Sequence, residues 1–146
     1  MMKTIKNGNG RIKNLNLYNQ ILKKFVYELQ VPIAAAKGAA ESVYEKHMET
    51  NKPIDQIIAD SRKWAQECLP DTIDQEKIDG EEIQDRKLFF EIVQKLKNRM
   101  YPVIDAKIQA YGIYNLIVKE GWKDSIDSII DSSDSYAMVT LPDLHK

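Results

Sequence analysis

Cysteine is nearly absent from this chain, and long apolar runs are absent altogether. Its 146 residues include one Cys, six Gly and five Pro. The single thiol, Cys68, excludes a disulfide scaffold and a zinc site built from several cysteines. No stretch approaches the roughly 20 apolar residues of a membrane-spanning helix, and the first residues lack the pattern of a signal peptide. We therefore expect a cytoplasmic protein without membrane segments.

A large net charge is also lacking, but the charges are distributed unevenly. The chain has 21 Lys+Arg and 22 Asp+Glu, and its formal net charge is −1. Basic residues are concentrated in the first thirty positions, whereas residues 67–85 and 123–146 are acidic. This asymmetry indicates either a charged partner or attraction between parts of one chain or of two subunits.

Apolar residues recur at the three- and four-residue spacing of amphipathic helices. The spacing predicts helices over residues 14–29, 33–48, 53–69, 81–118 and about 123–131, with Asn14 or Asn16 as the candidate cap of the first. Pro32 and Pro102 must either bend or end helices. Strand patterns and an internal repeat are not apparent. We therefore predict an all-α fold, a compact bundle of five or six helices.

The ends of the chain differ from its middle. Residues 1–13 are rich in Gly, Asn and Lys and predict a flexible basic arm. Residues 14–135 carry the helical pattern and predict a single helical domain. Residues 136–146 predict a short extended C-terminal tail that is closed by Pro142.

A run of small side chains at 34–40 indicates a close helix contact. We expect this helix to form a homo-oligomer interface through Ala36, Ala40 and Tyr44. Further interface candidates are the aromatic residues that fit the inward-facing stripes least well, which are Tyr27, Tyr114 and Trp122.

The sequence predicts no metal, cofactor or catalytic site. His47 lacks a second ligand at the helical spacing that a metal site needs. Cys68 lies on an apolar helix face and is expected to be a buried structural thiol. The remaining candidate is one acidic helix face, which we interpret as solvated: Asp124, Asp127, Asp131 and Asp134.

The segment Phe25–Gly38 resembles the phosphoacceptor box of sensor histidine kinases, in which the motif His-Glu-Leu-Arg-Thr-Pro-Leu opens a helical hairpin. Tyr27 stands in the place of the phosphoacceptor histidine, and nothing downstream resembles an ATP-binding domain. We favour an ordinary core helix interrupted by proline and assign no family. The matching residues are Glu28, Leu29, Pro32 and Ile33.

These observations favour a small helical protein that binds a macromolecular partner and is not an enzyme. Its Lys-, Asn- and Ile-rich composition suggests a bacterial or phage source, in which such proteins are often inhibitors, immunity proteins or assembly factors. A small-ligand or nucleotide-binding helical protein is one alternative. The other alternative is nucleic-acid binding through the basic arm, supported by helix residues such as Lys95 and Arg99. The arm residues concerned are Lys3, Lys6, Arg11 and Lys13.

Overall fold

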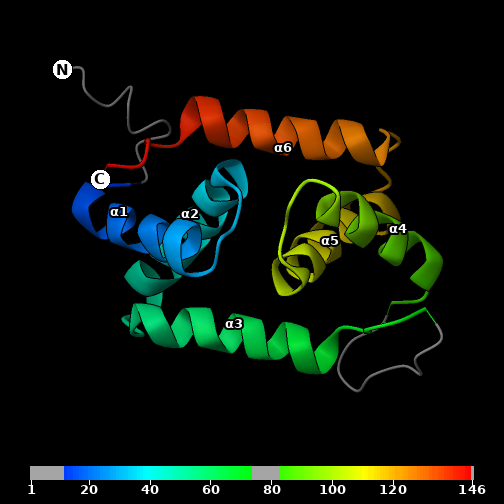
Figure 1. The fold of residues 1–146 in the computed structure, drawn as a ribbon, viewed down its shortest axis with the longest axis horizontal. Coiled ribbons are helices and arrows are strands. Elements are labelled where there is room, and N and C mark those ends of the chain that lie inside the picture. Colours follow the sequence, from blue (N-terminus) through cyan, green and yellow to red (C-terminus); the bar gives the residue numbers. More distant parts are fainter. Residues whose placement is uncertain (1–11, 74–82, 146) are drawn as a thin grey trace. The chain divides into compact units, whose positions relative to one another are not determined.

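The computed structural model describes residues 12–73 and 83–145, and every regular element in that part of the chain is helical. The prediction of an all-α fold with five or six helices is therefore confirmed. The elements, labelled in Figure 1, are α1 (Leu15–Lys23), the π-helix η2 (Lys24–Glu28), α2 (Ile33–Thr50), α3 (Ile54–Cys68), α4 (Arg86–Lys97), α5 (Val103–Val118) and α6 (Ile126–Thr140).

Pro32 and Pro102 each separate two helices rather than bend one. Each is the N-cap residue of the helix that follows, α2 or α5. Their carbonyl oxygens accept the N–H groups of Ala36 at 2.7 Å and Ala106 at 2.8 Å. Proline suits the start of a helix because the N–H that it lacks would have no helical partner there.

Side-chain caps begin α1 and α4. The Oδ1 atoms of Asn14 and Asp85 accept the N–H groups of Leu17 and Leu88, each at 3.0 Å. These bonds satisfy amides that have no partner within the helix. Of the two candidate caps, Asn14 and Asn16, the structure uses Asn14. The predicted start of the fourth helix, at residues 81–82, lies outside the described residues, but residues 83–85 are not helical, so α4 begins later than predicted.

Both predicted terminal segments differ from the structure where the structure describes them. Ile12 is fully buried, and the N–H of Lys13 donates to Tyr44 Oη at 2.9 Å. The predicted arm therefore does not include its last two residues, and residues 1–11 lie outside the described part. The prediction of an extended tail is wrong over residues 136–140, because α6 continues to Thr140. Its buried face simply extends to Ala137, one helical turn before the buried Leu141.

The second half of the described chain repeats the first, so the expectation of no internal repeat is wrong. Residues 54–71 and 126–143 align without a gap, as IDQIIADSRKWAQECLPD and IDSIIDSSDSYAMVTLPD. Residues 32–44 and 102–114 share a proline, two alanines, a lysine and a tyrosine at matching positions. The shared residues are scattered among variable exposed positions, which is why periodicity alone did not reveal them.

The buried cores of the two repeats correspond position by position. Every member of the first core cluster has a buried counterpart in the second repeat. The pairs are Ile12/Ile83, Tyr18/Phe89, Ile21/Ile92, Leu22/Val93, Phe25/Leu96, Val31/Tyr101, Ala36/Ala106, Ala40/Ala110, Val43/Ile113, Tyr44/Tyr114 and Ile57/Ile129.

The π-helix η2 accommodates one residue that the second repeat lacks. Val31 donates its N–H to the carbonyl of Phe25, whereas the matching bond in the second repeat joins Tyr101 to Leu96 and spans one residue fewer. A π-turn closes over one residue more than an α-turn. Both segments then turn sharply through a residue with positive φ, Gln30 in the first repeat and its counterpart Met100 in the second.

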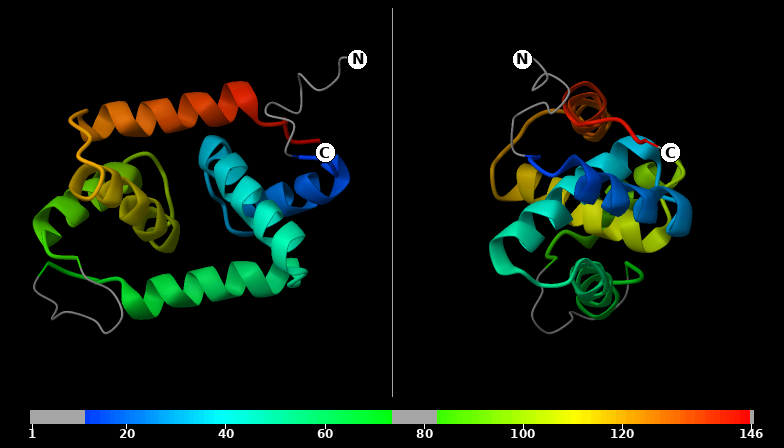
Figure 2. Two further views of the ribbon diagram at one scale, coloured as in Figure 1. Left: turned by 180° about the vertical axis from the view of Figure 1, so that it is seen from behind. Right: turned by 90° about the vertical axis from the view of Figure 1, so that its left-hand side faces the viewer.

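The contacts of the chain form two compact units, and each unit contains parts of both repeats. Unit 1 comprises the described residues of Met1–Ile58 and Asp131–Lys146, and unit 2 those of Ala59–Ile130. Helices α1 and α2 pack together in unit 1, as α4 and α5 do in unit 2 (Figure 2). The unit boundaries fall at matching positions inside α3 and α6. Helix α3 therefore begins in unit 1 and ends in unit 2, and helix α6 begins in unit 2 and ends in unit 1. A single domain over residues 14–135 was the expectation.

Candidate functional site

A buried lysine binds the end of a long helix in each unit. In unit 1, the side chain of Lys37 on α2 is 1% exposed, and its Nζ lies 2.9 Å from Asp143 Oδ1 and 3.4 Å from the carbonyl oxygen of Leu141. In unit 2, the Nζ of Lys107 on α5 lies 2.6 Å from Asp71 Oδ1. A buried ammonium needs such partners because an unpaired charge is costly away from water.

Both ion pairs connect one repeat to the other. The acceptor sequences are Leu69-Pro70-Asp71 and Leu141-Pro142-Asp143, and in each the Leu and Pro are buried while the Asp is exposed. Because this arrangement occurs twice, we attribute it to the fold. Positions at which the two units differ are then the better candidates for function.

The clearest difference is a polar cluster in unit 1 that unit 2 replaces with aromatic rings. In unit 1, Tyr136 Oη donates to Glu41, at 3.2 Å from Oε2 and 3.5 Å from Oε1. The matching residues in unit 2 are Trp64 and Tyr111, whose rings meet edge to face with centroids 5.3 Å apart. In unit 2 the two rings fill the matching positions by aromatic packing, without burying a carboxylate such as that of Glu41.

Tyr18 belongs to the same polar cluster and has an unusual environment. Its Oη is buried and has no hydrogen-bond partner among the described residues. Burial is the main cause that raises the pKa of Tyr18, and the nearby Glu41, Asp143 and Tyr136 raise it further. The hydroxyl is therefore held in its neutral form. The matching residue in unit 2 is Phe89, so the hydroxyl is not required by the fold.

Unit 2 has a different charged contact, between α3 and α5. Arg62 Nη1 lies 2.8 Å from Asp105 Oδ1. Burial raises the pKa of Asp105, and the guanidinium of Arg62 acts in the opposite direction. No equivalent pair can form in unit 1, because the residues at the matching positions are Asp134 and Ala35.

The outward face of α6 in unit 1 is apolar where the matching face of α3 is polar. Tyr136, Met138 and Val139 are 42%, 47% and 84% exposed, although Ala137 between them is buried. Aligned with Met138 and Val139 are the exposed residues Gln66 and Glu67 of α3. We name the pair Met138 and Val139 the α6 surface, because Tyr136 aligns with the aromatic Trp64 and is bound to Glu41. Because α3 shares the fold and carries polar residues here, packing does not explain the α6 surface.

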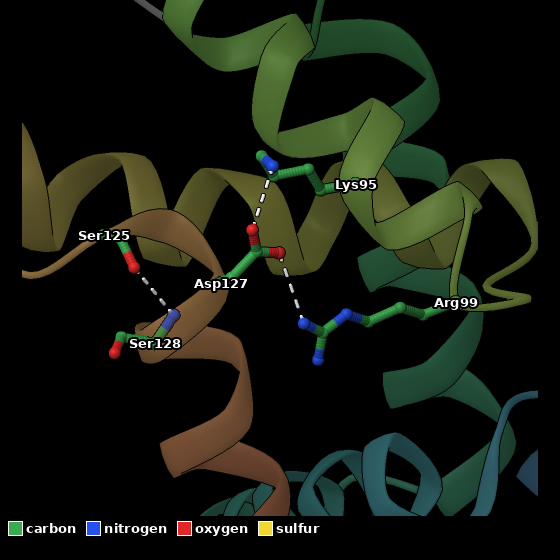
Figure 3. A network of polar contacts seen from close by, with 5 residues as sticks. All are labelled: Lys95, Arg99, Ser125, Asp127 and Ser128. Carbon is green, nitrogen blue, oxygen red and sulfur yellow. Dashed lines mark hydrogen bonds and ion pairs between the residues drawn. The ribbon is translucent and has the colours of Figure 1, made fainter.

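The beginning of α6 is held in unit 2 by an ion-pair network. Figure 3 shows the carboxylate of Asp127 between Lys95 Nζ at 3.0 Å and Arg99 Nη2 at 3.3 Å. The hydrogen bond to Lys95 is the main cause that lowers the pKa of Asp127. Beside it, Ser125 Oγ accepts the N–H of Ser128 at 3.1 Å. Two of the basic helix residues considered for nucleic-acid binding are thus engaged within the chain.

The predicted small-residue interface lies inside unit 1. Ala36 and Ala40 are fully buried, and Tyr44 is 2% exposed. Tyr44 Oη also accepts the N–H of Asn14 at 2.9 Å. The close helix contact indicated by the small residues therefore exists within one chain, between α2 and its neighbours. Self-association through these residues stays a prediction.

The three aromatic interface candidates have two different environments. Tyr114 is 3% exposed and its Oη accepts the N–H of Asp85 at 2.9 Å, so it lies on the inward stripe that it was expected to fit poorly, and its role at an interface stays a prediction. Tyr27 and Trp122 are 51% and 42% exposed. Tyr27 lies in η2, where the first repeat has its extra residue, and Trp122 lies in the α5–α6 connection, which is longer than the α2–α3 connection. Of the arm residues, Lys13 is exposed, whereas Lys3, Lys6 and Arg11 lie outside the described residues.

Residues considered for metal or thiol chemistry have ordinary surroundings. His47 Nδ1 lies 2.6 Å from the carbonyl oxygen of Lys52. Cys68 is half-buried rather than fully buried as predicted. Over residues 12–73 and 83–145, no group of three or more His, Cys, Asp or Glu could hold a metal ion. Within the same ranges, no helix combines the length and the apolar character needed to cross a membrane.

Comparisons of the chain with models of protein families, with curated proteins and with solved structures find no match. Functional positions are therefore sought by comparing one repeat of the chain with the other. Sequence reasoning missed the α6 surface because it assigned residues 136–146 to an extended tail. The second Leu-Pro-Asp sequence was the signal that could have placed those residues on a helix.

Proposed function

We propose that the chain acts by binding a protein partner through the α6 surface, and that it is not an enzyme. The observation that carries the proposal is the difference between matching positions of two helices. Met138 and Val139 are exposed on α6, whereas their counterparts on α3, Gln66 and Glu67, are polar. Exposed apolar side chains that the fold does not require are typical of interaction surfaces.

The exposed side chains indicate the chemistry of the partner. Asp127, at the beginning of α6, is already paired with Lys95 and Arg99 within unit 2. Met138 and Val139, in unit 1, are 47% and 84% exposed. We therefore expect a partner segment that places apolar side chains against Met138 and Val139. This arrangement is compatible with an inhibitor, immunity protein or assembly factor.

The test replaces the α6 surface with residues that the same fold already tolerates. The double variant Met138→Gln/Val139→Glu gives α6 the side chains of α3, and Gln66→Ala/Glu67→Ala changes the matching exposed positions as a control. We expect immobilised wild-type protein and the control to retain the same partner protein from a bacterial lysate, and the α6 variant to lose it. Equal retention by the wild type and the α6 variant would contradict the proposal.

A further inference from the structure

The contacts in the two units show what kind of chain segment packs against the buried lysine of each unit. In both, α2 or α5 presents a buried lysine to the aspartate of a Leu-Pro-Asp sequence that ends a helix of the other repeat. The alanine one helical turn before each Leu-Pro-Asp, Ala65 or Ala137, is buried as well. The accepted segment is therefore a helix end that carries a buried alanine, a buried leucine and an aspartate.

We propose that a second copy of this chain can supply that segment to unit 1, so that two chains exchange residues 131–145. We call these residues the C-terminal arm. Each unit 1 would then be completed by the arm of the other chain, with the same contacts as in the single chain. Exchange of identical segments forms a closed dimer without a new interface.

The contacts of the C-terminal arm in unit 1 are suited to exchange. Two side-chain hydrogen bonds join the arm to α2. Lys37 donates to Asp143, and the hydroxyl of Tyr136 donates to Glu41. At its end, Asn19 Nδ2 donates to the carbonyl of His145 at 2.7 Å, and the N–H of His145 donates to Asn19 Oδ1 at 2.8 Å. All of these partners lie on α1 or α2, and a second chain presents the same groups.

The arm is joined to the rest of α6 through a segment of poor helix formers. The unit boundary falls after Ile130, and Asp131-Ser132-Ser133-Asp134-Ser135 follows immediately. Serine and aspartate are poor helix formers because their side chains compete for backbone hydrogen bonds. The matching segment of α3, residues 59–63, contains Ala, Arg and Lys, which favour helix. Opening of α6 at residues 131–135 is therefore less costly than opening of α3.

Competition within the single chain determines when exchange occurs. A segment tethered to its own binding site has an effective concentration on the order of millimolar. Wild-type protein at micromolar concentration should accordingly remain monomeric. Exchange becomes dominant when the contact within one chain is made unfavourable and the contact between two chains is kept favourable.

Reversing each charge in a separate chain produces that condition. In Lys37→Asp the two carboxylates at positions 37 and 143 repel each other, and in Asp143→Lys the two ammonium groups do. When the two variants are mixed, both exchanged contacts pair opposite charges. The double variant Lys37→Asp/Asp143→Lys restores attraction within one chain and is the matched control.

Native mass spectrometry with one variant labelled with ¹⁵N distinguishes the outcomes. We expect the equimolar mixture to form a dimer that contains one chain of each kind, and each variant alone and the double variant to remain monomeric. A mixture that stays monomeric while the double variant is folded would overturn the proposal.

A second measurement avoids substitution of the buried Lys37. Labelled and unlabelled wild-type chains are incubated together at about 1 mM, the range of the effective concentration, then diluted and analysed at once. We expect mixed-mass dimers, and in a similar proportion with Asp143→Ala, because that variant loses the same contact in the monomer and in the exchanged dimer. If mixed dimers do not form at this concentration, exchange does not occur, whatever the folding of the charge variants. Neither test changes Met138 or Val139, so failure of the exchange is distinguishable from failure of the proposed docking surface.

Discussion

Lys37 and Asp143 bind each other at 2.9 Å with very different exposure: the lysine side chain is 1% exposed and the aspartate side chain 72%. The two partners therefore depend on the pair unequally. Without the lysine, Asp143 remains hydrated, whereas without the aspartate the buried ammonium loses its carboxylate. The same inequality holds for Lys107 and Asp71, at 3% and 69%.

Removing the aspartate should therefore destabilise the protein more than removing the lysine. We expect Asp143→Ala to lower the free energy of unfolding by about 1–3 kcal/mol, the cost of leaving a buried polar group unsatisfied. Lys37→Met keeps most of the buried volume and should have a smaller effect. Urea denaturation of both variants and of the double variant measures the difference. The explanation is refuted if Lys37→Met proves the more damaging change.

The two core tyrosines allow a matched comparison. Tyr44 Oη accepts two backbone N–H groups, from Lys13 and Asn14, and Tyr114 Oη accepts that of Asp85. Replacement by phenylalanine keeps the ring and leaves these amides unsatisfied, at about 1–3 kcal/mol for each buried group. We expect Tyr44→Phe to be the more destabilising variant in urea denaturation. Amide hydrogen exchange should accelerate at Asn14 in Tyr44→Phe and at Asp85 in Tyr114→Phe, and the reverse assignment would contradict these contacts.

Tyr18→Phe should stabilise the protein, because the buried Oη of Tyr18 has no hydrogen-bond partner among the described residues. Removing an unsatisfied hydroxyl should raise the free energy of unfolding by about 1 kcal/mol at neutral pH. The control is Phe89→Tyr, which adds a hydroxyl at the matching position and should destabilise unit 2. Equal or lower stability of Tyr18→Phe would show that the hydroxyl is satisfied in solution.

The raised pKa of Tyr18 adds a pH dependence. Because the pKa in the folded protein lies above that of the unfolded chain, near 10, the neutral tyrosine contributes stability below pH 10 that is lost as pH rises further. The wild type should therefore lose stability from about pH 10 upward more steeply than Tyr18→Phe. Urea midpoints measured between pH 8 and 11 test this, and parallel curves for the two proteins would contradict it.

Asp127 has the opposite dependence, because Lys95 and Arg99 lower its pKa. A lowered pKa contributes stability above the unfolded value, near 4, which is lost as pH falls through the lower folded value. The wild type should be more stable than Asp127→Asn at pH 7, and the difference should vanish at lower pH and shrink in high salt. Asp124→Asn serves as a control outside this network. A difference between wild type and Asp127→Asn that is as large at pH 3 as at pH 7 would refute the role of the ion pairs.

Prediction from the sequence succeeded where a feature depends on nearby residues and failed where it depends on distant ones. The caps and the two prolines were recognised because their effects depend on residues within one helical turn. The end of α6 was missed because the Asp/Ser sequence at 131–135 disfavours helix locally, and residues 136–140 are held as helix by the burial of Ala137 and Leu141. Tyr114 was misplaced because its Oη binds the backbone of Asp85, which is distant in sequence.

By itself, the sequence determined the helical class and most of the helix boundaries, because three- and four-residue spacing, caps and prolines act over short distances. Only the tertiary structure decided that Lys37 binds Asp143 and that Lys107 binds Asp71. A lysine and an aspartate carry no local signal of their partner, and each lysine could equally have met the Leu-Pro-Asp sequence of its own repeat. The choice depends on where α3 and α6 end, which is set by the packing of helices far apart in the chain.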